Sequence, residues 1–306
     1  MNSKSKKFLR EVKLNRWTYL FILIPLIWLI VFSYVPMYGI TLAFKDYDIT
    51  GSIMSSPFCG LDHFMSLFSD VMFWEAFGNT LLISFGTLLF CFPFPIILAL
   101  LLNEMREGKL KKVFQVLFTF PNFLSWVIVA GIIKNILGTE GLLNMFLSLF
   151  GVEKQNFLMN PSLFRPILYA ANIWKGAGWG AIVYIASIVS IDETLYEAAK
   201  IDGATRLQLM WHITFKLIRP TIIVMLILNL GNIMNAGFDP IFNLSNPVVR
   251  SESEIIDTYI YNITFDSSSF DFGYSTAVGL FKSVINFALL ITSNFVVKRL
   301  GGRGIA

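Results

Sequence analysis

The chain has 306 residues, of which 55% are hydrophobic and only 14% charged, and its formal net charge is +4 at pH 7. A soluble domain has roughly one quarter charged residues, so the composition excludes an ordinary soluble protein and indicates an integral membrane protein. Two cysteines, Cys59 and Cys91, provide neither a disulfide framework nor the spacing of a metal site.

Long stretches without charged residues predict six transmembrane helices in a single all-α domain, residues 17–299. A span needs about 20 apolar residues, and two of the uncharged stretches reach that length only when extended across one lysine each. The predicted spans are residues 17–40, 77–102, 113–136, 166–190, 220–238 and 272–297. The first span follows a basic segment, residues 1–16, but it is too long for a signal peptide and no small-residue cleavage site follows, so we expect it to be retained.

The distribution of Lys and Arg predicts the topology of these spans. Outside the spans, 17 basic residues fall in the N-terminal segment, the second and fourth loops and the C-terminal tail, against 3 in the other loops. By the positive-inside rule, both termini and the second and fourth loops face the cytoplasm. Anionic lipid at that surface accounts for the basic residues, so the charge indicates no nucleic-acid partner.

The fourth loop, residues 191–219, has the pattern of two short helices joined by a glycine. Ser190 followed by Glu193 is typical of a capping box and predicts that a helix begins there. Apolar residues recur at helical spacing on both sides of Gly203: Leu195, Ala198 and Ala199 before it, and Leu207, Met210 and Trp211 after it. An apolar face in a cytoplasmic loop has to pack against something, which predicts a partner protein.

This loop resembles the EAA loop of the permease subunits of bacterial binding-protein-dependent ABC importers. The matching residues are Glu197, Ala198, Ala199, Asp202, Gly203 and Ile213. The wider resemblance runs from about Ala76 to the C-terminal end of the chain. The sequence departs from the family pattern at Lys216, where the family has proline, and this leaves open the direction in which the second helix leaves the loop.

The resemblance implies the type I importer permease fold in the cell membrane, with the fourth loop docked into a cytoplasmic ATPase. It also implies three kinds of partner: a second, similar permease, a dimer of ATPase subunits and an extracellular solute-binding protein. The chain has no Gly-x-x-x-x-Gly-Lys-Ser/Thr phosphate loop. We therefore expect no catalytic residue, metal or cofactor in this chain, with ATP and Mg²⁺ bound by the partner.

Polar residues within the predicted spans indicate where a solute could cross. Lys175 and Lys282 lie inside the fourth and sixth spans, and Asn229, Asn232 and Asn235 are spaced to form a slowly turning stripe on the fifth. Polar groups at this depth usually face a bundle interior or a wet cavity. With two neighbouring aromatics the candidate path is Trp174, Lys175, Asn229, Asn232, Asn235, Phe238 and Lys282. The alternatives are that the asparagines join helices by hydrogen bonds and that Lys175 snorkels or pairs with a carboxylate.

The cargo is indicated mainly by a second resemblance. Residues 174–179, 196–204 and 237–240 are similar to the oligosaccharide branch of sugar permeases, which includes importers of polysaccharide fragments. A lysine in the path could suit an acidic sugar. Two alternatives stay open: an importer of a peptide, an amino acid or an ion, and a channel or assembly anchor without ATP coupling.

Overall fold

The computed structural model describes residues 14–266 and 270–299, and within these residues the regular structure is helical apart from one isolated bridge between Lys45 and Phe58. Five helical segments are long and apolar enough to cross a membrane: Arg16–Phe44, Val71–Glu104, Trp126–Ser148, Arg206–Gly231 and Phe272–Phe295. A sixth is reached when Pro161–Val189 and Glu193–Ile201, which are bent by 71° at the break between them, are taken together as one span. The predicted all-α architecture with six spans is therefore confirmed.

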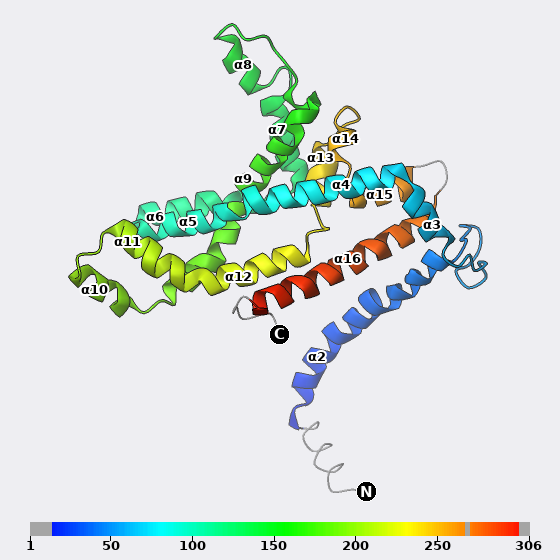
Figure 1. The fold of residues 1–306 in the computed structure, drawn as a ribbon, viewed down its shortest axis with the longest axis horizontal. Coiled ribbons are helices and arrows are strands. Elements are labelled where there is room, and N and C mark those ends of the chain that lie inside the picture. Colours follow the sequence, from blue (N-terminus) through cyan, green and yellow to red (C-terminus); the bar gives the residue numbers. More distant parts are fainter. Residues whose placement is uncertain (1–13, 267–269, 300–306) are drawn as a thin grey trace.

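The N-terminal part of the first span stands away from the other helices. It consists of α2 (Arg16–Leu29), a π-helical turn (Ile30–Tyr34) and a 3₁₀ segment (Val35–Phe44). None of the residues of α2 is buried, and the helix diverges from the bundle (Figure 1). The 3₁₀ segment packs on the last helix, α16 (Phe272–Arg299).

The second span begins earlier than predicted. After α3 (Asp62–Ser69), α4 (Val71–Gly86) continues through a π-helical turn (Thr87–Cys91) into α5 (Pro93–Glu104). The helix begins at residue 71, not 77, because the Asp70 carboxylate accepts hydrogen bonds from the backbone N–H groups of Met72 and Phe73 and so caps it.

The third predicted span, residues 113–136, is not one helix. The chain forms α6 (Lys109–Thr119), a 3₁₀ turn (Phe120–Phe123), α7 (Trp126–Leu137) and then α8 (Leu142–Ser148). The break follows from Pro121, which has no N–H for the helical ladder, and from Ser125, whose side chain caps α7. The prediction of a continuous helix was wrong because a proline within an apolar run was passed over.

The longest helix, α9 (Pro161–Val189), is central to the bundle and packs along α5, α6 and α12 (Phe215–Gly231). It follows a short 3₁₀ turn, Phe157–Met159. Its backbone approaches α6 so closely at Gly178 that an added Cβ would overlap the Phe118 carbonyl. Glycine at this position therefore sets the distance between the two helices. A buried cluster fills the α5, α9 and α12 interface: Ile96, Ala99, Leu100, Ala181, Tyr184, Ile188 and Ile218.

The fifth span differs from the prediction at both ends. It begins with α11 (Arg206–Leu209), passes through a π-helical turn (Met210–Thr214) and ends with α12 at Gly231, not at residue 238. Asn232 leaves the helical conformation with φ −111° and ψ 17°. Lys216, which stands where the family has proline, lies inside α12, and this helix continues past Pro220. The chain therefore leaves the loop as a continuous helix.

Short helices cover the end of the bundle opposite the fourth loop. They are α13 (Phe238–Leu244), α14 (Arg250–Ser253), α15 (Ile256–Tyr261) and a π-helical turn (Asn262–Asp266). Figure 1 shows α3 and α15 at one end of the bundle and α10 (Glu193–Ile201) with α11 at the other. An ion pair between Arg165 and Glu252, with an N–O distance of 2.7 Å, ties α14 to α9.

Candidate functional site

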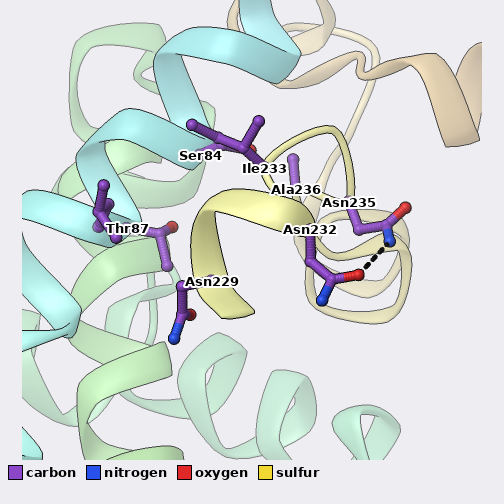
Figure 2. Close-up of a pocket in the computed structure, with 8 residues that line it drawn as sticks. Ser84, Thr87, Asn229, Asn232, Ile233, Asn235 and Ala236 are labelled. Carbon is purple, nitrogen blue, oxygen red and sulfur yellow. Dashed lines mark hydrogen bonds between the residues drawn. The ribbon is translucent and has the colours of Figure 1, made fainter. Parts of the chain in front are cut away.

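A polar recess lies where α12 ends beside the π-helical turn between α4 and α5. Figure 2 shows its lining from these two parts of the chain. The recess has a volume of about 110 Å³ and is lined by Ser84, Thr87, Leu88, Asn229, Asn232, Ile233, Asn235 and Ala236. The three asparagines predicted from the sequence are therefore brought together in one place.

These asparagines lie together because α12 ends there, and not because they form a stripe along one helix. Only Asn229 lies within α12, because Asn232 is its C-cap and Asn235 belongs to the turn that follows. The Asn229 and Asn232 side-chain amides donate to carbonyls of the preceding helical turn, at 2.8 and 3.0 Å. Asn235 Nδ2 donates to Asn232 Oδ1 at 3.3 Å (Figure 2). The prediction of one helical stripe was thus wrong, although the residues do share a recess.

The turn is held in place from the neighbouring sixth span. The backbone N–H of Met234, which is fully buried, donates to Asn286 Oδ1 on α16 at 3.1 Å. This bond satisfies a backbone group that the helix no longer pairs. The backbone of the turn is therefore supported by protein, whereas the side chains of Asn229, Asn232 and Asn235 are exposed in this chain.

Two hydroxyls in the recess have no hydrogen-bond partner within the described residues. They are Ser84 Oγ and Thr87 Oγ1, and both atoms are buried. Buried hydroxyls are usually paired, and leaving one unpaired costs free energy. An incoming hydroxyl or a water molecule in the recess could satisfy both groups.

A larger recess of about 370 Å³ adjoins the first and shares Thr87, Asn229, Asn235 and Ala236 with it. Its opposite wall is α9, which contributes Asn172, Gly176, Gly180 and Tyr184 among other residues. Sequence reasoning missed Asn172 and Thr87. The rule applied to the other asparagines, that a polar side chain in a span indicates a cavity, would have found both.

Aromatic side chains continue this surface beyond Gly237, which also lines the larger recess. Phe238 stacks on Phe242, with ring centroids 5.0 Å apart and an interplanar angle of 18°. Tyr261 lies against both rings, at 5.6 and 5.0 Å. Phe242 is 45% exposed and Tyr261 36%, so this aromatic face is partly open, but the predicted path residue Phe238 lines neither recess.

The two lysines of the candidate path are held by other protein groups. Lys175 Nζ donates to the Asn122 carbonyl at 2.7 Å, in the break between α6 and α7, and lies over the Trp126 ring. Lys282 Nζ pairs with Asp257 at 2.5 Å. Neither lysine, nor the half-exposed Trp174, lines either recess.

The fourth loop forms the predicted pair of helices, but its first cap differs from the prediction. Asp192, not Ser190, caps α10 and accepts the backbone N–H of Thr194 at 3.0 Å, while Ser190 ends α9. The predicted Ser190–Glu193 capping box was wrong because α9 continues to Val189 and places Ser190 in its own last turn. Hydrogen bonds from the Thr194 backbone and hydroxyl lower the pKa of Asp192, which favours the charged cap.

A glycine turn joins the two loop helices. Gly203 has φ +81°, in the left-handed region that favours glycine, and Thr205 and Gln208 form a capping box that starts α11. A cup of about 340 Å³ opens at this turn, lined by Ala199, Asp202, Gly203, Ala204, Gln208, Leu209, His212 and Ile213. Four of the six predicted coupling residues therefore share one concave surface.

The rest of the loop presents side chains outward. Glu197 and Ala198 are exposed and do not line the cup. Among the apolar residues, Leu207 is 67% exposed and Ile201 86%, whereas Leu209 is buried. Leu207 was expected on a packed face, and this chain alone does not cover it. Such exposure, in a loop predicted to be cytoplasmic, is what a protein-docking surface requires.

The sequence matches a known protein family and curated relatives over most of its length. Residues 92–302 match the model of the family described as binding-protein-dependent transport system inner membrane component. The chain is 43% identical to the polygalacturonan/rhamnogalacturonan transport system permease protein YteP of Bacillus subtilis, over 99% of this chain and 94% of that protein. It is 38% identical to protein LplB of the same organism, over 99% and 95%.

A solved structure has the same fold. A chain of a bacterial alginate ABC transporter, crystallised with an alginate pentasaccharide-bound periplasmic protein, superposes with a TM-score of 0.87 at 38% identity. The superposition covers 97% of this chain and 99% of that one.

Six apolar helical segments, a broken fifth span with a polar recess and an exposed helical loop define a multi-pass transport subunit of the cell membrane. The chain belongs to the family of binding-protein-dependent transport system inner membrane components. It is thus an ABC importer permease, and a separate subunit hydrolyses the ATP.

Proposed function

We propose that this chain forms part of the path through which an ABC importer takes up an oligosaccharide. The observation that carries the proposal is the pair of adjoining recesses, which are lined by amides, hydroxyls and apolar groups and by no Asp, Glu, Lys or Arg. Sugar hydroxyls both donate and accept hydrogen bonds, as do the amides of Asn229, Asn232 and Asn172. The aromatic face of Phe238, Phe242 and Tyr261 suits the apolar faces of sugar rings.

The relatives support a polysaccharide fragment as the cargo. The named relative transports polygalacturonan and rhamnogalacturonan, and the alginate transporter imports an acidic polysaccharide. Since both recesses of this chain are uncharged, its own contribution is recognition of hydroxyls and ring faces. Lys175 and Lys282 keep their protein partners and contribute to the shape of the path rather than to direct contact.

The assembly that we propose contains a second, similar permease, a dimer of cytoplasmic ATPases and an extracellular solute-binding protein. ATP and Mg²⁺ are bound by the ATPases and not by this chain. The fourth loop docks on the ATPase through Glu197, Ala198, Ala199, Asp202, Gly203 and Ile213. Its exposed apolar side chains, such as Ile201, and its concave turn support this role.

Transport measurements on amide variants test the cargo site. Asn229→Leu and Asn232→Leu in the reconstituted importer should each raise the oligosaccharide concentration needed for half-maximal uptake by about 2- to 10-fold, the loss of one hydrogen bond. Asn103→Leu in α5 is the matched control, because this amide lies outside both recesses. Unchanged uptake in both recess variants would contradict the proposed site.

A pair of glycine variants tests the coupling loop. Gly203 and Gly151 have similar positive φ values, +81° and +77°, and neither has an atom within 4 Å of an added Cβ. Both Gly→Val changes therefore impose similar backbone strain, but only Gly203 lies in the loop. Gly203→Val should lose ATP hydrolysis stimulated by the loaded binding protein, whereas Gly151→Val should keep it. Equal stimulation in both variants would place coupling elsewhere.

A further inference from the structure

Another concave surface lies on the far side of α9 from the asparagine recesses. It is a groove of about 590 Å³ between α5, α6 and α9. Its walls are largely apolar: Leu102 from α5, Val116 and Phe118 from α6, and Gly178, Ile182 and Ile185 from α9. This volume lies within the range of about 300 to 1,000 Å³ found for small-molecule sites.

Helical geometry separates this groove from the cargo path. Gly176 and Gly180 line the larger recess, whereas Gly178 and Ile182 line the groove. Residues two positions apart on an α-helix point roughly 200° away from each other. If the recesses face the path, as proposed above, the groove faces away from it and toward the bilayer.

Polar side chains run along one wall of the groove. Lys112, Gln115 and Thr119 of α6 all line it, at the spacing of one helix face. Lys111 is paired with Glu107 at 2.5 Å, but no carboxylate lies within 4 Å of Lys112 in the described part of the chain. The groove is therefore amphipathic, with an exposed cation at one end.

The position of that cation matches the inner surface of the membrane. The α5–α6 connection lies at the same end of the bundle as α10 and α11, which carry the cytoplasmic loop (Figure 1). A basic pocket between spans on the cytoplasmic side suits an anionic lipid head group, and the apolar walls suit its acyl chain. The residues that line the groove supply no counter-charge for Lys112, so an occupant with an anionic group is favoured over a purely apolar one.

We propose that the groove between α5, α6 and α9 binds one anionic phospholipid of the inner leaflet, with its phosphate at Lys112 and an acyl chain along Val116 and Ile182. Gln115 donates to the phosphate or to the ester oxygens. The orientation of the groove rests on the proposed path, but the lipid site is measured without any transport assay.

Native mass spectrometry of the purified importer tests the site, with phosphatidylglycerol and phosphatidylcholine added at equal concentrations. The wild type should retain phosphatidylglycerol in preference. Lys112→Gln should reduce that preference about fivefold, the effect of one basic residue at the surface. Val116→Trp should fill the groove and remove the bound lipid. Lys298→Gln, an exposed lysine on α16, is the matched control and should bind as the wild type does.

Size-exclusion chromatography and basal ATP hydrolysis show whether each variant still assembles. Wild-type retention of phosphatidylglycerol in both Lys112→Gln and Val116→Trp would overturn the proposal. A cysteine at position 116 that cross-links to another protein subunit would also overturn it, because a protein would then occupy the groove. Unchanged oligosaccharide uptake in the Asn229 and Asn232 variants would contradict the proposed cargo site but would leave the lipid measurement unaffected, so the two proposals fail separately.

Discussion

Replacing Gly178 with alanine should destabilise the protein by an amount set by the contact between α6 and α9. An added Cβ would overlap the Phe118 carbonyl and lie 2.6 Å from the Thr119 backbone nitrogen, where ordinary contact begins at 3.4 Å. The two backbones must therefore move apart by at least about 0.8 Å, the difference between these distances. A gap of that size forfeits roughly a quarter to a half of the dispersion energy along the contact.

Overpacking of this kind typically destabilises a protein by about 1 to 3 kcal/mol. We expect a value at the upper end of this range, because the added Cβ meets backbone atoms, which no side-chain rotation can move away. Gly131→Ala in α7 is the control. Its added Cβ meets nothing within 4 Å, so it should be neutral or stabilise by about 0.5 to 1 kcal/mol, the usual gain for alanine over glycine in a helix.

The assay is thermal unfolding of the purified complex, followed by the fraction that remains monodisperse after heating. Gly86→Ala provides a second comparison, because its Cβ would meet the Tyr169 side chain, 2.9 Å from Cε2. Truncation of Tyr169 should rescue Gly86→Ala, whereas no truncation on α6 should rescue Gly178→Ala. A melting temperature of Gly178→Ala at or above that of the wild type would refute the reasoning.

Three further outcomes follow from polar contacts. Lys175→Met removes the bond to the Asn122 carbonyl in the broken third span and should lower stability by about 1 to 3 kcal/mol, measured by thermal unfolding, whereas a role in cargo contact alone would leave stability unchanged. Lys282→Met and Asp257→Leu should each destabilise more than the double variant, since each single change leaves one partly buried charge unpaired, and a double-mutant cycle measures this. Asp192→Ala should speed amide hydrogen exchange in the first turn of α10. In the wild type, the Asp192 cap should weaken only as the pH falls through the folded-state pKa of this carboxyl, which lies below 3.8.

Much of the architecture could be read from the sequence because its causes are local. Uncharged stretches of about 20 residues can be buried only in a bilayer or a large core, so the number of spans follows from composition. The turn at Gly203 was predictable for the same reason, because a left-handed backbone conformation favours glycine wherever it occurs.

Helix ends were less predictable, since neighbours along the chain compete for them. Ser190 and Asp192 both precede the loop helix and both are suitable caps, and the choice depended on how far α9 continues before it. The end of α12 at Gly231 is a similar case, because the turn after it is supported by Asn286, about fifty residues later in the chain.

The sequence by itself determined which polar residues lie at membrane depth, but only the tertiary structure decided what each one faces. Asn229, Asn232 and Asn235 meet Thr87 of the second span in a recess, while Lys175 donates to a carbonyl in the break at Pro121 in the third span. A polar group in an apolar medium takes the nearest partner in space, and that partner is set by how the helices cross and not by spacing along the chain.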